Sequence, residues 1–372
     1  MKKTFLYFCL LFIVQTAFAA DSLYVREQQI PILIDRIDNV LYEMRIPAQK
    51  GDVLNEITIQ IGDNVNLSDI QAIRLFYSGV EAPSRKGEHF SPVTYISSHI
   101  PGNTRKALES YSVRQDEVTA PLSRTVKLTS KQPMLKGINY FWVSIQMKPE
   151  TSLLAKVATT MPNAQINNKP IDITWKGKVD ERHVGIGVRQ AGDDGSAAFR
   201  IPGLVTTNNG TLLGVYDIRY NSSVDLQEKI DIGVSRSTDK GQTWEPMRVA
   251  MTFKQTDGLP HGQNGVGDPS ILVDEKTNTI WVVAAWTHGM GNERAWWNSM
   301  PGMTPDETAQ LMLVKSEDDG KTWSEPINIT SQVKDPSWYF LLQGPGRGIT
   351  MQDGTLVFPI PVSYTHLRAH ET

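Results

Sequence analysis

One eight-residue pattern occurs twice in this chain and constrains its fold more than any other feature. Residues 237–244 and 316–323 both read Ser-x-Asp-x-Gly-x-Thr-Trp. An Asp followed by Gly and then by Thr-Trp suits a tight hairpin turn, in which the carboxylate accepts backbone N–H groups. Asp239 and Asp318 hold the same place in the two copies, so both are predicted to be structural rather than catalytic. The repetition indicates a fold built from recurring β-units.

A second hairpin pattern alternates with the first and begins near residues 200, 268 and 347. Each copy has a short apolar strand, a tight polar turn and a second strand, with Asn209-Gly210 and Asp353-Gly354 at two of the turns. Both dipeptides are strong hairpin signals because their residues tolerate positive φ. One hairpin of each kind makes a four-stranded unit, and such units repeated radially form a β-propeller.

Period-two alternation of apolar residues dominates the earlier part of the chain. Ile57–Ile61, Ile73–Tyr77 and Phe141–Met147 alternate in this way, as strands with one face in a core do. We therefore predict an all-β chain, with an N-terminal β-sandwich over residues 21–180. An incomplete β-propeller is predicted to follow over residues 184–361.

Residues 1–20 have the pattern of a secretory signal peptide. Lys2 and Lys3 precede a short apolar run, and Ala17-Phe18-Ala19 matches a signal-peptidase site. The apolar run is too short to cross a bilayer as a helix, and a buried N-terminal helix is the alternative. We expect a secreted or periplasmic protein with no integral membrane segment after cleavage. Cys9, the single cysteine, would be removed, so the mature chain needs a large core instead of disulfides.

The charge balance gives no reason to expect a nucleic-acid partner. Lys and Arg number 37 against 40 Asp and Glu, a formal net charge of −3 at pH 7. His183, His261 and His288 lack the spacing of metal ligands, and no nucleophile elbow or phosphate loop is present. No cofactor or metal is expected, and structural calcium is left open.

Two arginines flank the first hairpin of the predicted propeller. Arg200 precedes Asn209, the centre of the turn, by nine residues, and Arg219 follows it by ten. Antiparallel pairing is expected to set the two guanidinium groups side by side, an arrangement that is destabilising unless an anion lies between them. Two guanidinium forks suit a carboxylate. A pair of solvated surface arginines is the alternative.

Together these motifs resemble those of the bacterial sialidases. The repeated pattern resembles the family's Asp box, and Phe199-Arg200-Ile201-Pro202 resembles its Phe/Tyr-Arg-Ile-Pro motif. Residues 343–348 resemble the Gly-rich strand entry after the second box. The chain is identified as similar to gut-bacterial exo-alpha-sialidases (neuraminidases) with an N-terminal, carbohydrate-binding-like sandwich domain. The resemblance implies a six-bladed propeller and the removal, with retention, of terminal sialic acid from glycoproteins, glycolipids and oligosaccharides.

The resemblance also implies roles for residues of the first two units. Arg200 and Arg219 would be two of three arginines that bind the carboxylate of sialic acid. Asp225, in the loop after Arg219, would act as general acid and then as base, with Asp231 as its nearest rival. Asp268, interpreted as starting the second unit as Arg200 starts the first, would bind amide or hydroxyl groups of the sugar. A strand-end cap is the alternative for Asp268.

Residues near the third hairpin are assigned less specifically. Gln343 would reach the glycerol arm of the sugar. Trp286, Trp296 and Trp297 would form either an apolar wall of the site or ordinary loop packing, and the choice stays open. Sialidases use a Tyr nucleophile with a partner Glu, which the family places after the third inner strand together with the third arginine.

Residues 362–372 lose the strand pattern and are interpreted as a non-native tail, so Tyr364 and Glu371 receive no role. We therefore expect a C-terminally truncated chain that is inactive by itself. Its expected partners are sialylated glycans. The alternative functions are a non-catalytic sialoglycan-binding propeller protein and a purely structural Asp-box propeller, with trans-sialylation as a variant of the enzyme.

Overall fold

A computed structural model of the protein describes residues 22–27, 29–80, 112–290 and 295–363. The described chain is nearly all β, as predicted, and its contacts divide it into two units. The first unit contains the described residues up to His183 except Leu33–Asp35, and the second contains those three and the chain from Val184 onward. The predicted signal peptide and residues 364–372 lie outside the described residues. No helix in the described ranges is long and apolar enough to cross a membrane.

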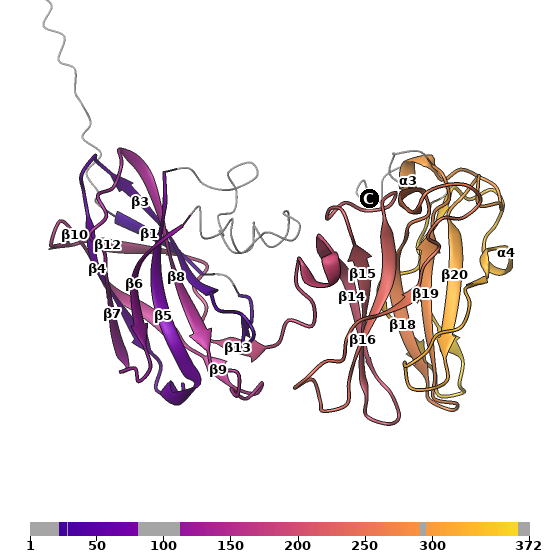
Figure 1. Ribbon diagram of the computed structural model, residues 1–372, viewed down its shortest axis with the longest axis horizontal. Helices are drawn as coiled ribbons and strands as arrows, with labels where there is room; N and C mark the ends of the chain where they lie inside the picture. Colours follow the sequence, from indigo (N-terminus) through magenta and orange to yellow (C-terminus); the bar gives the residue numbers. More distant parts are fainter. Residues whose placement is uncertain (1–21, 28, 81–111, 291–294, 364–372) are drawn as a thin grey trace, which may run out of the picture. The chain divides into compact units, whose positions relative to one another are not determined.

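The first unit contains two β-sheets (Figure 1). The larger has the order β12-β1-β3-β8-β5-β6 and the smaller the order β11-β10-β4-β7. The strands of the larger sheet are β1 (Ser22–Arg26), β3 (Asn39–Ala48), β5 (Ile70–Gly79), β6 (Val113–Thr119), β8 (Gly137–Met147) and β12 (Asp172–Lys176). Those of the smaller sheet are β4 (Leu54–Ile61), β7 (Thr125–Thr129), β10 (Thr159–Ile166) and β11 (Lys169–Pro170). A short 3-10 helix, η1 (Leu67–Asp69), precedes β5, and a small further sheet joins β2 (Ile32–Leu33), β13 (Arg182–Gly185) and β9 (Lys156–Val157).

The two larger sheets of this unit pack face to face. Alternate residues of β4, Ile57, Ile59 and Ile61, are fully buried, which is the pattern of a strand with one face in a core. The Tyr42 hydroxyl on β3 donates a buried hydrogen bond of 2.7 Å to Thr159 Oγ1 on β10, in the opposite sheet. The unit is therefore a β-sandwich, as its alternating pattern predicts.

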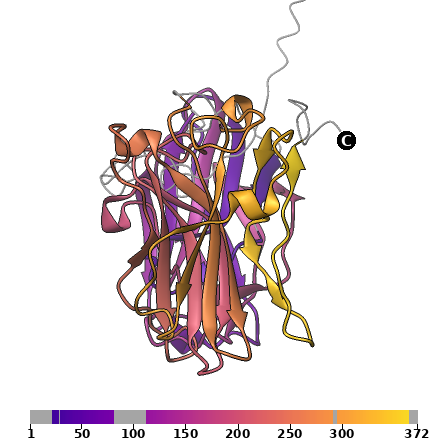
Figure 2. The ribbon, with the colours of Figure 1, turned by 90° about the vertical axis from the view of Figure 1, so that its right-hand side faces the viewer.

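The second unit is built around two antiparallel sheets, which lie next to each other in Figure 1 and overlap in the view of Figure 2. One has the order β14-β15-β16-β17, and the other has the order β21-β20-β19-β18 with β23 added in parallel beside β18. The first contains β14 (Ala198–Thr206), β15 (Leu212–Arg219), β16 (Ile230–Ser237) and β17 (Arg248–Met251). The second contains β18 (Val266–Asp274), β19 (Thr279–Trp286), β20 (Gln310–Ser316), β21 (Ile327–Asn328) and β23 (Gly346–Arg347).

Short elements complete this unit. The remaining strands form two small pairs, β22 (Phe340–Leu341) with β26 (Val362–Ser363) and β24 (Ile349–Thr350) with β25 (Leu356–Val357). The helices are η2 (Asp193–Gly195), η3 (His261–Gln263), α3 (Ala295–Asn298) and α4 (Thr330–Val333). The predicted hairpins near residues 200, 268 and 347 correspond to β14–β15, β18–β19 and β24–β25. Val362 and Ser363, assigned from the sequence to a non-native tail, form a strand.

One apolar core joins the two main sheets of the second unit. Val215 and Val234 on the first sheet pack in the same buried cluster as Ile271, Val282 and Val314 on the second. Each sheet shows the succession of hairpins expected for one propeller unit. Closure of such units into a propeller stays a prediction.

Both copies of the repeated motif fold into the same hydrogen-bonded turn. In the first, Ser237 Oγ, Thr243 N and Thr243 Oγ1 donate to the Asp239 carboxylate over 2.6–3.0 Å. Asp318 accepts the equivalent bonds in the second copy. Hydrogen bonds from Thr243 lower the pKa of Asp239 to about 2, and those to Asp318 overcome its partial burial and give the same value. Both carboxylates are thus committed to their own turns.

Candidate functional site

A register shift in the first hairpin places Arg200 and Arg219 on one face of the sheet. From Thr206 to Gly203, β14 pairs with β15 in the register that centres the turn on Asn209. Between Gly203 and Arg200 the register moves by one residue, so Arg200 lies opposite Asp217 and Ala198 lies opposite Arg219. In the unshifted register the two arginines would project from opposite faces, because one residue of slip reverses every side chain. The pairing expected from the sequence was therefore incomplete, because it omitted this β-bulge.

The backbone of the bulge is strained. Ile201 has a φ of 56°, and a β-branched residue in the left-handed region costs about 1–3 kcal/mol. Pro202 follows it and donates no backbone hydrogen bond. Such strain persists only where the surrounding structure imposes it and is typical of functional sites. Here its result is that two guanidinium groups share one face.

The two guanidinium groups converge on one carboxylate oxygen. Arg200 Nη1 donates to Asp225 Oδ1 over 2.8 Å and Arg219 Nη1 donates to the same atom over 2.6 Å. Both Nη1 atoms also donate to the carbonyl oxygen of Ser223, over 3.0 Å and 2.9 Å. The side chain of Arg200 is 42% exposed, whereas that of Arg219 is 1% exposed. One carboxylate therefore already lies where the sequence predicted an anion between the two arginines.

A buried carboxylate, Asp217, holds Arg219 in place from behind. Its Oδ2 accepts bonds from Arg219 Nε (3.0 Å) and Nη2 (2.7 Å), so only the Nη1 side of that guanidinium faces the site. Burial and the nearby charge of Asp268 raise the pKa of Asp217 to about 7, against the attraction of Arg219. Burial alone would lower the pKa of Arg219, but the charges of Asp217 and Asp225 raise it. Arg200 is thus the arginine that can offer a full bidentate fork.

Asp268 joins the same group from the second sheet. Its backbone N–H donates to Asp217 Oδ1 over 2.8 Å. Burial and the charge of Asp225 raise the pKa of its carboxyl, while Arg219 and Arg200 lower it, so its charge interacts with both guanidinium groups. We call Arg200, Asp217, Arg219, Asp225 and Asp268 the arginine cluster.

The sequence-based equivalence of Asp268 and Arg200 was wrong by one residue. The second hairpin has the same register shift, between Gly267 and Ser270, and Asp268 has a φ of 57° within it. Asp268 is followed by Pro269, as Ile201 is by Pro202. Asp268 therefore corresponds to Ile201, and Gly267 occupies the place of Arg200.

The loop that carries Asp225 is fixed at both of its ends. At its start, the Tyr220 hydroxyl donates to Asp231 Oδ2 over 3.0 Å, and His261 Nε2 lies 2.8 Å from Asp231 Oδ1. At its end, the Gln227 amide is buried and bonds to Thr287, to Gly289 and to Gly265 N. Asp231 is 3% exposed, and its carboxylate bonds to Tyr220 and His261. Of the two candidates for the acid–base carboxyl, Asp225 is therefore the accessible one.

Gln343 and the tryptophans do not join the hydrogen bonds of the arginine cluster. Gln343 is fully buried, and neither its Oε1 nor its Nε2 has a hydrogen-bond partner among the described residues. Trp286 ends β19 and stacks on Phe253 with ring centroids 4.3 Å apart, so its indole belongs to the core. Trp297 is 38% exposed, and the Trp296 side chain lies outside the described residues.

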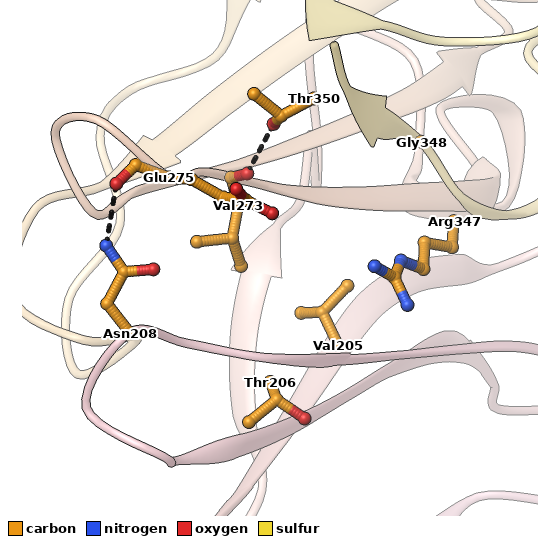
Figure 3. A pocket seen from close by; sticks show the side chains of 8 residues that line it. All are labelled: Val205, Thr206, Asn208, Val273, Glu275, Arg347, Gly348 and Thr350. Carbon is orange, nitrogen blue, oxygen red and sulfur yellow. Dashed lines mark hydrogen bonds between the residues drawn. The ribbon is translucent and has the colours of Figure 1, made fainter. Parts of the chain in front are cut away.

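A separate pocket of about 290 Å³ opens at the other end of β14 and β18 (Figure 3). Asn208, Glu275, Arg347 and Thr350 are among the residues that line it, and none belongs to the arginine cluster. Thr350 Oγ1 donates to Val273 O and Asn208 Nδ2 donates to Glu275 O along its wall. Arg347 is the one arginine among its lining residues, so the pocket has no convergent arginine pair, and we place the chemistry at the arginine cluster. Within the described ranges, no three His, Cys, Asp or Glu residues form a group that could hold a metal ion.

Comparison with known proteins identifies the family. The model described as the N-terminal domain of BNR-repeat neuraminidase matches residues 20–170, and a BNR repeat-like domain matches residues 201–368. A sialidase of Bacteroides fragilis (strain YCH46) is 60% identical over 365 residues, covering 96% of this chain and 67% of the relative. This chain belongs to the sialidase family.

Other sialidases extend the comparison. The solved structure of a Hadza microbial sialidase is 63% identical, with a TM-score of 0.79, over 91% of this chain and 66% of that one. A sialidase of Paraclostridium sordellii is 36% identical over 173 residues, which cover 44% of this chain and 39% of the relative. The chain thus spans about two thirds of the length of the first two relatives.

Asp217 is the member of the arginine cluster that sequence reasoning missed. It stands on β15, two residues before Arg219, where period-two alternation puts both side chains on the same face. A carboxylate beside an arginine on one face of a strand was a signal that could have identified it. That this face points inward and is buried could be learned only from the structure.

Proposed function

We propose that this sialidase-family protein is an exo-alpha-sialidase that binds terminal sialic acid through the arginine cluster and hydrolyses its glycosidic bond. The observation that carries the proposal is the convergence of Arg200 and Arg219 on a single carboxylate oxygen. Sialic acid bears a carboxylate on its anomeric carbon, and Arg guanidinium groups bind carboxylates in a fixed plane. The membership of the family supports the same substrate class.

In this proposal the arginines contribute unequally to binding. Asp217 occupies two nitrogens of Arg219, so Arg219 offers one N–H edge to the sugar while Arg200 offers its bidentate fork. We assign to Asp268 the role of accepting hydrogen bonds from hydroxyl or amide groups of the sugar. These contacts would fix the anomeric carbon beside the Asp225 loop.

Asp225 is proposed as the general acid and base. In its protonated form it gives a proton to the leaving glycosidic oxygen, and as a carboxylate it then takes a proton from the incoming water. Retention follows from the Tyr nucleophile that the resemblance implies. The chain spans about two thirds of the length of its first two relatives, so the reaction is proposed for a protein of their full length.

Binding by the chain itself tests the proposal. Arg200→Ala should weaken the binding of N-acetylneuraminic acid by about 10- to 100-fold, the value of one charged hydrogen-bonded pair. Isothermal titration calorimetry measures this, with Arg114→Ala, in an exposed ion pair of the sandwich, as the matched control. Equal binding by both variants would exclude Arg200 from the site.

Kinetics of a full-length enzyme that carries this sequence test the acid–base role. Asp225→Ala should lower kcat by about 10²- to 10⁴-fold, because a positioned acid–base group contributes that much. KM should not rise, since Asp225 is not assigned to sugar binding. An unchanged kcat would remove Asp225 from the mechanism. We also propose that the protein is secreted or periplasmic, which cell fractionation would test.

A further inference from the structure

We propose that the Asp225 carboxylate occupies the binding position of the substrate carboxylate until a sialoside displaces it. Because only a sugar with a carboxylate can replace it there, Asp225 also selects for acidic sugars. This inference rests on the proposed function and adds to it a second, earlier role for the same residue.

The first argument is geometric. The Nη1 atoms of Arg200 and Arg219 are the two donors that converge, and both donate to Asp225 Oδ1 and to Ser223 O. A sugar carboxylate that bridges both arginines needs Nη1 of Arg219, because Nε and Nη2 of that arginine are held by Asp217. Asp225 and the substrate therefore compete for one place.

The second argument is the charge of the arginine cluster. Three carboxyl groups, those of Asp217, Asp225 and Asp268, surround two guanidinium groups. A substrate carboxylate would be a fourth carboxyl group, and burial and neighbouring carboxylates already raise the pKa values of Asp217 and Asp268, so the group accepts a further negative charge poorly. If the incoming carboxylate replaces that of Asp225, the charge around the arginines is unchanged. A neutral sugar has no carboxylate to replace that of Asp225, so its binding would leave the arginines without this anion.

The third argument concerns the proton. Hydrogen bonds from two guanidinium groups, such as those to Asp225, favour the ionised form of a carboxyl, and that form has no proton to donate. Once displaced, the carboxylate takes up one proton from the bulk solvent. It later passes that proton to the glycosidic oxygen, which keeps the electron pair of its broken bond, while the Tyr nucleophile that the resemblance implies forms the new bond to the anomeric carbon. Displacement by the substrate would thus turn Asp225 from a ligand of the arginines into an acid.

The loop has the anchors that a local displacement requires. Tyr220 is tied to Asp231 at one end, and Gln227 makes four hydrogen bonds at the other. Residues 221–225 lie between these anchors and are exposed or half-buried, with Val224 38% exposed. A shift of this short arc can free the arginines while both neighbouring strands stay in place.

The test compares the binding of an acidic and a neutral sugar by the 372-residue chain and its variants. In Asp225→Asn and Asp225→Ala the charged competitor is gone, so N-acetylneuraminic acid should bind about tenfold more tightly than to the unaltered chain. The methyl ester of N-acetylneuraminic acid, which has no carboxylate, should bind all three proteins with affinities equal to within about twofold. Asp257→Asn, at an exposed position whose positive φ suits Asn, is the control for loss of one negative charge and should leave both affinities unchanged.

The outcomes separate the inference from the proposed function. Equal or weaker binding of N-acetylneuraminic acid by both Asp225 variants, with binding still dependent on Arg200, would overturn the inference and leave the proposed function intact. An equal gain for the acid and its ester would also overturn it, because the effect would then be steric. Binding of neither sugar by any form would overturn the proposed function and the inference together.

Discussion

Asp217 determines how the arginine cluster is held, although its side chain is buried. Its Oδ2 fixes Arg219 and its Oδ1 receives the backbone N–H of Asp268, so one buried carboxylate connects the first sheet of the second unit to the second. Removing Asp217 would leave Nε and Nη2 of the buried Arg219 without an acceptor, with only Nη1 still paired to Asp225, and breaking a buried ion pair from one side is costly.

Asp217→Ala should therefore lower the free energy of unfolding by about 3–5 kcal/mol. Urea denaturation measures this, with Asp63→Ala as the control, since Asp63 is fully exposed on the sandwich. A loss below about 1 kcal/mol would show that Arg219 finds another partner.

The raised pKa of Asp217 also predicts a pH dependence. Between its ordinary value of 3.8 and about 7 the folded protein binds this proton more tightly than the unfolded chain does. The stabilisation is therefore fully present below about pH 4 and is lost as the pH rises towards 7. Between about pH 5 and about pH 8 the unaltered protein should lose more stability than Asp217→Asn, which has no proton to release. Parallel stability curves for the two proteins would contradict this prediction.

At the scale of elements, the close approach of β14 to β23 leaves no room for a side chain at Gly203. A Cβ added at Gly203 would lie 2.1 Å from the carbonyl oxygen of Gly346 on β23, too close for any side chain. At Gly214, on the neighbouring strand of the same hairpin, a Cβ would meet only the Trp244 ring at 3.8 Å. Gly203 is thus required by packing, without any positive φ.

Gly203→Ala should lower the free energy of unfolding by about 1–3 kcal/mol, because the backbone of β23 must move away. Gly214→Ala should be neutral or slightly stabilising, since Ala costs less conformational entropy than Gly in a strand. Thermal denaturation of the two variants makes the comparison. Equal melting temperatures would show that β23 moves freely.

The second Asp box also ties its sheet to the neighbouring one. Asp319 occupies a variable position of the motif and accepts hydrogen bonds from Thr207, Asn209 and Thr211 in the β14–β15 turn and from Arg236 on β16. These bonds outweigh its partial burial and lower the pKa of Asp319. In the first box the same position is Lys240.

Asp319→Asn should destabilise the second unit by about 1–2 kcal/mol, because the buried Arg236 loses a charged partner. Asn tolerates the positive φ of both Asp319 and Lys240, so Lys240→Asn is the matched control and should have little effect. Chemical denaturation followed by tryptophan fluorescence reports both variants. A larger loss of stability in Lys240→Asn than in Asp319→Asn would contradict the proposed role of Asp319 in joining the two sheets.

At the scale of the whole molecule, repetition and alternation were the features readable from the sequence. Period two predicted the strands of the sandwich, and the Asn209-Gly210 turn and the Asp-box turns predicted the hairpins that form. The bulges at Ile201 and Asp268 were not predicted, because a single residue of register is set by tertiary packing that no local pattern encodes. The contact between Asp225 and the arginines was missed for the same reason, since it depends on loop anchors such as Gln227 that only the folded chain brings together.

The division into two units predicts that each folds on its own core. A chain of residues 22–183 should unfold in one cooperative urea transition. Its two tryptophans, Trp142 and Trp175, report that transition by fluorescence. A gradual, non-cooperative loss of signal would show that the sandwich depends on the rest of the protein.

The recurrence of one backbone kink in two hairpins has a consequence for how such a site can change. In both hairpins the kink contains a residue with positive φ followed by proline, whereas the side chain at that residue is a hydrocarbon in Ile201 and a carboxyl in Asp268. A chain built from repeated hairpins thus has the same backbone position more than once. The side chain at one of these positions can change while the backbone of the other hairpin stays the same.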